Sequence, residues 1–280
     1  MQFQCGLTLG CTFQALKVVF ILRLFYKESG DLENPLIVFL HGGGVSGWMW
    51  EKQLEYFHDY HCLVPDLPGH GLSSRMDFSI HSSAEEIGSL IQAKAQGKQV
   101  ILVGFSLGAQ IAIKILSLYP DLVDYAIINS ALVRPIPLAN KVIKPTVRLT
   151  YRLTKNRAFS KIQAKQLYIG DQMFEKYYKE TTDMERNTLI KILEENMSFR
   201  IPKDFSRSKA KILITVGNHE KQIMKKSVSD LVDKNMNCKG VIIPSVGHGV
   251  SLALPDLFNK MVDAWIHDRE LPSGLIPVIK

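Results

Sequence analysis

The sequence Val100-Ile101-Leu102-Val103-Gly104-Phe105-Ser106-Leu107-Gly108 decides the fold. Its first four residues form an unbroken aliphatic run, which is typical of a strand buried on both faces of a sheet. The run leads directly into the pattern G-x-S-x-G, and a helical pattern follows. In this setting the serine is expected on a sharp, strained turn with its hydroxyl above the sheet. The helix N-terminus behind it favours developing negative charge, so we take Ser106 as the candidate nucleophile.

Short apolar runs recur on both sides of this stretch and alternate with helical patterns. Such alternation predicts an α/β fold with a doubly wound, mostly parallel sheet. We expect strands at residues 18–26, 36–40, 62–65, 100–103, 125–128, 212–216 and 241–243, and helices at 84–95, 108–118, 222–235 and 255–266.

The alternation stops within residues 132–206, which show helical patterns only. Ligands of open α/β sheets bind beyond the carboxyl ends of the strands, so an insertion at this point is most simply a lid over that site. The expected organisation is a leader of uncertain order (1–17), a core domain (18–131 and 207–270), a helical cap insertion (132–206) and a C-terminal tail (271–280).

Composition and charge exclude several classes of protein. The chain has 280 residues, 46% of them hydrophobic and 22% charged, which rules out collagen-like, coiled-coil and wholly disordered chains. Its net charge of +7 comes from residues 134–211, where 18 Lys and Arg face 8 Asp and Glu, a net of +10. The rest holds 16 basic and 19 acidic residues, a net of −3. Without a block of consecutive Lys or Arg, or a known motif, nucleic-acid binding is not expected.

The cysteines and the amino-terminal residues indicate in which cellular compartment the protein is expected. The four cysteines are widely separated and form no C-x-x-C pair, which argues against a disulfide framework or a cysteine zinc site. This usage suits a reducing compartment, and we expect a cytoplasmic protein. The apolar stretch 5–26 lacks a basic start and is interrupted by Lys17 and Arg23, so we expect neither a signal peptide nor a spanning helix there.

A serine nucleophile requires a base, and His248 is the histidine in the right setting. It lies in a loop directly after the late strand at 241–243. A third residue, an acid, should hold the imidazole, and Glu220 is the first carboxylate in the loop after residues 212–216. The alternative for Glu220 is a solvated charge that pairs with Lys221. Asp230 and Asp233 lie farther on, within a helix.

The oxyanion of an acyl-transfer reaction needs backbone donors. One is expected to be the N–H of Leu107, directly after the nucleophile. The other is expected from the loop His41-Gly42-Gly43-Gly44, where Gly43 is favoured and Gly44 is the alternative. Gly44 and Phe105 are also expected to contact substrate. His41 is interpreted as a structural hydrogen-bonding residue of this loop, and the segment Asp66–Ser73 as architecture near the site.

These motifs together resemble those of the α/β-hydrolase superfamily. The likeness covers residues 20–133 and 207–270 and is greatest to single-domain bacterial esterase-like or lipase-like members with a helical cap. It implies hydrolysis through an acyl-enzyme, no cofactor and no metal. Position by position, it implies Ser106 as nucleophile, His248 as base and Glu220 as acid, with glutamate where the family mostly has aspartate.

Three functions remain open on the sequence. The first is hydrolysis of small carboxylic esters. The second uses the same residues on a thioester, on a carbon–carbon bond or in a lyase-type step of cofactor metabolism. The third is a ligand-sensing or partner-binding protein on a hydrolase scaffold. The expected partner is a small ester-type substrate, any membrane contact would come through the basic cap, and the protein would be a monomer or homodimer.

Seven aromatic residues of the cap bear on substrate specificity. At helical spacing most of them are expected to pack on the core, and the rest to contact substrate. They are Tyr151, Phe159, Tyr168, Phe174, Tyr177, Tyr178 and Phe199.

Overall fold

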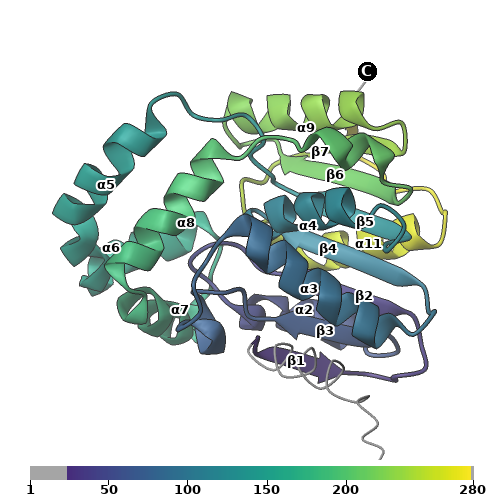
Figure 1. Ribbon diagram of the computed structural model, residues 1–280, viewed down its shortest axis with the longest axis horizontal. Helices are drawn as coiled ribbons and strands as arrows, with labels where there is room; N and C mark the ends of the chain where they lie inside the picture. Colours follow the sequence, from purple (N-terminus) through teal and green to yellow (C-terminus); the bar gives the residue numbers. More distant parts are fainter. Residues whose placement is uncertain (1–23, 279–280) are drawn as a thin grey trace, which may run out of the picture.

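The computed structural model describes residues 24–278. An eight-stranded sheet lies at the centre, with helices on both faces (Figure 1). The strand order is β1-β3-β2-β4-β5-β6-β7-β8, and only the two edge pairs, β1 with β3 and β7 with β8, are antiparallel. The expected mostly parallel α/β sheet is therefore confirmed. The strands are β1 (Tyr26–Ser29), β2 (Leu36–Leu40), β3 (His61–Pro65), β4 (Val100–Phe105), β5 (Tyr125–Asn129), β6 (Lys211–Gly217), β7 (Cys238–Ile243) and β8 (Ile276–Val278).

The helices connect these strands and form the insertion between β5 and β6. The α-helices are α2 (Glu51–Tyr56), α3 (Ile80–Ala95), α4 (Leu107–Leu118), α5 (Ala139–Thr150), α6 (Arg157–Gln166), α7 (Asp171–Asp183), α8 (Arg186–Ser198), α9 (Gln222–Lys234), α10 (Val250–Ala253) and α11 (Pro255–Ile266). Short 3-10 turns are η1 (Gly47–Trp50), η2 (Gly71–Ser73), η3 (Tyr151–Lys155) and η4 (Lys203–Arg207).

Strands β2 and β4, at the centre of the sheet, are apolar at every position because both faces of the sheet are covered there. In β2, Leu36, Val38 and Leu40 belong to the core cluster under α3, α4 and α9. The alternate residues Ile37 and Phe39 belong to the cluster under α2 and α11 on the opposite face. Successive side chains of a strand point to opposite faces, so one unbroken apolar run supplies two cores.

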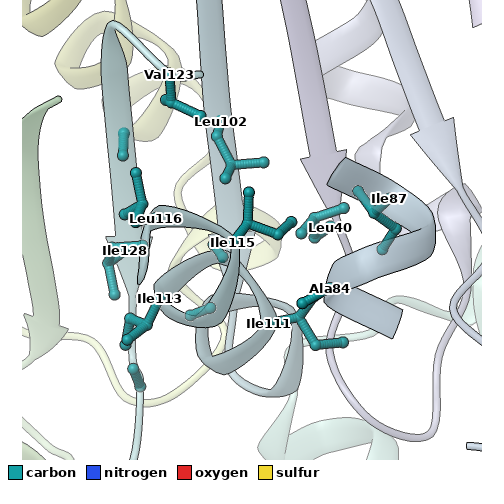
Figure 2. Packing of buried hydrophobic residues seen from close by; sticks show 14 of the residues in the cluster. Leu40, Ala84, Ile87, Leu102, Ile111, Ile113, Ile115, Leu116, Val123 and Ile128 are labelled. Atoms are coloured by element: carbon teal, nitrogen blue, oxygen red, sulfur yellow. The ribbon is translucent and has the colours of Figure 1, made fainter. Parts of the chain in front are cut away.

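Helix α3 begins four residues before the expected start at residue 84. The hydroxyl of Ser79 accepts a hydrogen bond from the N–H of Ser82 at 3.0 Å and caps the helix. Figure 2 shows Ala84 and Ile87 of this helix beside Ile111 and Ile115 of α4. These side chains fill the space between the two helices and the sheet.

Both ends of the sheet differ from the sequence interpretation. The first strand was expected at residues 18–26, but β1 is Tyr26–Ser29, and most of the expected strand and the leader 1–17 lie outside the described residues. The expected tail contains β8, whose Ile276 pairs with Ile242. Strand β1 is mostly polar, and β8 is only three residues long and contains a proline, so neither has the clear strand pattern of the central strands.

Helices α5 to α8 lie together beside one end of the sheet (Figure 1). Ile143 and Val147 of α5 pack with Ile190 of α8 in a small separate core. Phe174 and Tyr177 of α7 belong to the core cluster that contains Ile37 and Phe39 of β2. The insertion is thus attached to the core domain by apolar contacts as well as by the chain. No helix in residues 24–278 is long and apolar enough to cross a membrane.

Candidate active site

Ser106 occupies the turn between β4 and α4 in a strained backbone conformation. Its φ is 53° and its ψ is −111°, a region that residues other than glycine rarely adopt. The flanking glycines make this turn feasible. A Cβ on Gly104 would lie 2.6 Å from the carbonyl oxygen of Gly108, and one on Gly108 would lie 2.3 Å from that of Leu40. The G-x-S-x-G pattern therefore reflects close backbone packing around Ser106.

His248 lies next to Ser106, although 142 residues separate them in the chain. The imidazole Nε2 is 2.9 Å from Ser106 Oγ, and Nδ1 is 2.7 Å from Glu220 Oε2. Because a carboxylate only accepts hydrogen bonds, Nδ1 carries the proton. When Nε2 is unprotonated, it accepts a hydrogen bond from the Ser106 hydroxyl. This is the geometry by which a histidine can deprotonate a serine.

Glu220 follows β6 and has a side chain only 3% exposed. Burial alone would raise the pKa of this carboxyl group, but the hydrogen bond and charge of His248 lower it. The Ser130 hydroxyl and the Gly217 N–H also donate to Oε1, at 2.7 and 3.0 Å, and the net pKa lies below its usual value. Glu220 is therefore held as a carboxylate facing the imidazole.

The alternatives for the acid are placed elsewhere. Asp230 accepts two hydrogen bonds from the Arg134 guanidinium, at 2.5 and 2.6 Å. Glu220 interacts with His248 and not with the exposed Lys221. Of the candidate carboxylates, the structure brings Glu220 to the imidazole.

Two residues that sequence reasoning missed support this arrangement. Ser130 directly follows β5, has a positive φ of 57° and donates to Glu220. Tyr168, which was considered only as one of several cap aromatics, accepts a hydrogen bond from the Gly247 N–H at 2.8 Å. For Ser130, its position at the end of a strand was the only sequence feature that could have indicated a role in the site. For Tyr168, no local pattern predicts a contact with a loop 79 residues away.

The glycine loop after β2 lies beside the serine turn. A Cβ on Gly43 would lie 3.6 Å from Leu107 Cδ2, and Gly43, Gly44, Ser106 and Leu107 all line the same cavity. Neither the Gly43 N–H nor the Leu107 N–H donates a hydrogen bond to another residue within the described chain. Two N–H donors are thus left for a ligand oxygen beside Ser106.

His41 and the Asp66–Ser73 segment hold the glycine loop. The His41 ring bonds the Gly42 carbonyl at 2.8 Å through Nδ1 and accepts from the Leu67 N–H at 2.9 Å through Nε2. Complete burial lowers the pKa of His41 to about 4, so the ring is neutral at physiological pH. Asp66 accepts from the backbone N–H groups of Gly47 and Leu72. These contacts agree with the structural interpretation of both segments.

A cavity of about 900 Å³ lies between the serine turn and the insertion. Four of the seven aromatics singled out in the insertion line it: Tyr151, Phe159, Tyr168 and Tyr177. Gly44 lines it as expected, but Phe105 does not. Phe105 is 2% exposed, and the centroid of its ring lies 5.0 Å from that of the His248 ring. Phe105 therefore packs against the imidazole and does not face the cavity.

No cluster of three or more His, Cys, Asp or Glu side chains suited to a metal ion exists among residues 24–278. Cys62 and Cys238 are both buried in the core. The side chains hydrogen-bonded in series with Ser106 are the imidazole of His248 and the carboxylate of Glu220.

The family model of the alpha/beta hydrolase family matches residues 37–261. The chain belongs to this family. Solved structures agree on the fold: an esterase from Thermogutta terrifontis has a TM-score of 0.72 at 17% identity over 88% of this chain and 93% of its own. The enol-lactonase from Burkholderia xenovorans has a TM-score of 0.73 at 16% identity, over 87% of this chain and 96% of its own.

Curated relatives are similar over shorter stretches. An AB hydrolase superfamily protein of Gibberella zeae is 35% identical over 109 residues, which are 38% of this chain and 38% of the relative. An esterase of Mycobacterium tuberculosis is 36% identical over 92 residues, which are 32% of this chain and 30% of the relative. The matches thus span less than half the length of these relatives, which leaves the substrate of this chain to be inferred from its own site.

Proposed function

We propose that the protein hydrolyses carboxylic esters through an acyl-enzyme on Ser106. The observation that carries the proposal is the continuous hydrogen-bonded line from Ser106 Oγ through His248 to the buried Glu220 carboxylate. A hydroxyl needs a base to become a nucleophile. In this proposal His248 is the base, and the Glu220 carboxylate fixes the tautomer of the imidazole and balances the positive charge that the ring gains.

In the proposed mechanism, His248 takes the proton of Ser106 as Oγ attacks the ester carbonyl. In this proposal the oxyanion forms opposite the N–H groups of Leu107 and Gly43, two residues that line the same cavity as Ser106. His248 then gives its proton to the departing alcohol. It next activates a water molecule, which attacks the acyl-enzyme and regenerates Ser106.

The insertion at residues 132–206 is proposed as a lid that selects the substrate. Val147 of α5, Phe159 of α6, Tyr177 of α7 and Ile192 of α8 line the cavity that contains Ser106. Each helix of the insertion therefore contributes part of the wall. A cavity of about 900 Å³ with mainly apolar walls suits an acyl or alcohol group of moderate size.

Ester turnover by Ser106→Ala tests the proposal. The variant should lose activity by on the order of 10³-fold or more and retain only the residual rate from binding and oxyanion stabilisation. Chromogenic esters of graded chain length, with one thioester, would be assayed on purified protein. Ser206→Ala, an exposed serine of η4, is the matched control and should keep full activity.

Covalent labelling separates an enzyme from a binding protein. A fluorophosphonate should label Ser106 stoichiometrically in the wild type and not label Ser106→Ala. If folded wild-type protein neither reacts with the probe nor turns over any ester, the proposed function is wrong. If only the thioester is turned over, the mechanism stands and the substrate class changes.

A further inference from the structure

The segment between β5 and α7 has an unusual charge composition. From Arg134 to Gly170 the chain carries nine Lys and Arg residues and no Asp or Glu. Helix α5 and turn η3 lie within this segment, and α5 is at the outer edge of the insertion (Figure 1). We define residues 138–155 as the α5–η3 segment.

One face of the α5–η3 segment packs against the rest of the protein. Ala139, Ile143 and Val147 are buried against α8, at spacings of four residues. Such spacing keeps side chains on one face of a helix. This face is the usual apolar contact between an insertion and its neighbours.

A second apolar stripe of the same segment is exposed to solvent. Leu138, Val142, Leu149 and Leu153 are 66%, 55%, 83% and 45% exposed. Their separations of four, seven and four residues place them along one side, away from the buried face. Four large aliphatic side chains in one exposed line indicate an interaction surface, since scattered single residues would need no explanation.

Unpaired cations lie beside this stripe. Lys141, Lys144, Arg148 and Arg152 are exposed, and none of them forms an ion pair within residues 24–278. Other basic residues of the region differ, because Arg134 pairs with Asp230 and Arg157 with Glu175. The four cations are therefore free to meet negative charge outside the molecule.

We propose that the α5–η3 segment docks on an anionic lipid surface, with the apolar stripe inserted between headgroups and the four cations on lipid phosphates. A helix with an apolar side flanked by Lys and Arg is suited to lie in such an interface. A second copy of this chain would bring the same cations against each other. Residues 1–23 contain Lys17 and Arg23 and no acid, so their charge does not complement the four cations either.

Docking would place the cavity beside the lipid. Val147 and Thr150 of α5 line the cavity, while Leu149 between them is 83% exposed on the outside of the same helix. The helix that would contact the surface is thus also a wall of the substrate site. The docking itself does not depend on the proposed hydrolysis, and its test measures binding alone.

Vesicle co-sedimentation of the full chain tests the proposal. Vesicles of phosphatidylcholine with phosphatidylglycerol should bind the protein, vesicles of phosphatidylcholine alone should bind it much less, and added salt should release it. The stripe variant (Val142→Ser, Leu149→Ser, Leu153→Ser) should bind at least tenfold more weakly. The charge variant (Lys144→Gln, Arg148→Gln, Arg152→Gln) should bind roughly a hundredfold more weakly. All six positions are exposed, and unchanged circular dichroism would verify folding.

Matched controls use exposed residues elsewhere. Leu32→Ser with Met236→Ser, and Lys203→Gln with Lys239→Gln and Lys260→Gln, should leave vesicle binding unchanged.

An equal loss of vesicle binding in the control variants, or full binding by the stripe variant, would overturn the proposal. The proposal would also be overturned if the wild type did not bind vesicles and formed a dimer, while the stripe variant was a monomer. Binding to RNA that needs the cations but not the stripe, without vesicle binding, would show a different polyanion as the partner.

Discussion

The phenol oxygen of Tyr168 accepts a hydrogen bond from the backbone N–H of Gly247, 2.8 Å away. Tyr168 lies between α6 and α7 of the insertion, and Gly247 immediately precedes His248. A Cβ on Gly249 would lie 2.5 Å from the carbonyl oxygen of Leu167. The loop between α6 and α7 thus contacts the residues before and after His248. The insertion therefore contacts the loop that carries the candidate base.

Tyr168→Phe should lower ester kcat about three- to tenfold while reducing stability by about 0.5–1.5 kcal/mol, the usual contribution of one hydrogen bond. The loss of rate is expected because the loop of His248 becomes less well oriented toward Ser106. Steady-state kinetics and thermal unfolding measure the two effects. Tyr178→Phe removes a bond to the Lys155 carbonyl, away from the cavity, and is the control. Equal kcat values in both variants would contradict a positioning role.

Glu220→Gln should change how stability depends on pH. The pKa of Glu220 is lowered in the folded protein, so its carboxylate stabilises the fold above the unfolded pKa of about 4.3. That contribution is lost as the pH falls through the still lower folded pKa. Urea unfolding of both proteins should show a wild-type advantage near neutral pH that shrinks below about pH 4. A constant difference across this range would show that Glu220 is not held as a carboxylate.

Glu180→Gln should show the opposite pH trend. Glu180 of α7 accepts hydrogen bonds from Ser46 and the Trp48 indole, in the loop after β2, at 2.6 and 2.9 Å. Burial is the main cause of its raised pKa. A raised folded pKa means that its contribution is complete below the unfolded pKa and is lost as the pH rises through the folded one. Wild-type stability should therefore fall relative to Glu180→Gln from acidic toward neutral pH, as measured by urea unfolding. A flat difference would contradict the raised pKa.

Gly108→Ala should destabilise the protein by about 1–3 kcal/mol or more, because the new methyl group meets the backbone of β2. Backbone atoms cannot move aside as a flexible side chain can. Gly170→Ala is the matched control, since a Cβ there has no atom within 4 Å and its φ of −72° is ordinary. Thermal unfolding should show a lower Tm for the first variant only. Similar Tm values would mean that the turn at Ser106 relaxes more readily than its packing indicates.

Most of the core could be predicted from local patterns because buried parallel strands are continuously apolar. Strand β2 lies at its predicted residues, and β4 extends only two residues beyond the predicted end. The edge strand β8 could not be found in this way. Its three residues include Pro277, which weakens the strand signal of Ile276 and Val278, and pairing with β7 makes the segment a strand.

The sequence by itself determined the elements and the residue types of the site. The strand–turn–helix around Ser106, the glycines that permit it and the loop positions of Glu220 and His248 are all local features. The tertiary structure decided which residues of the site are in contact. It pairs Ser130 with Glu220, Tyr168 with Gly247, and the ring of Phe105 with that of His248. Local patterns act over a few residues, whereas these contacts join segments that only the packing of the sheet and the insertion brings together.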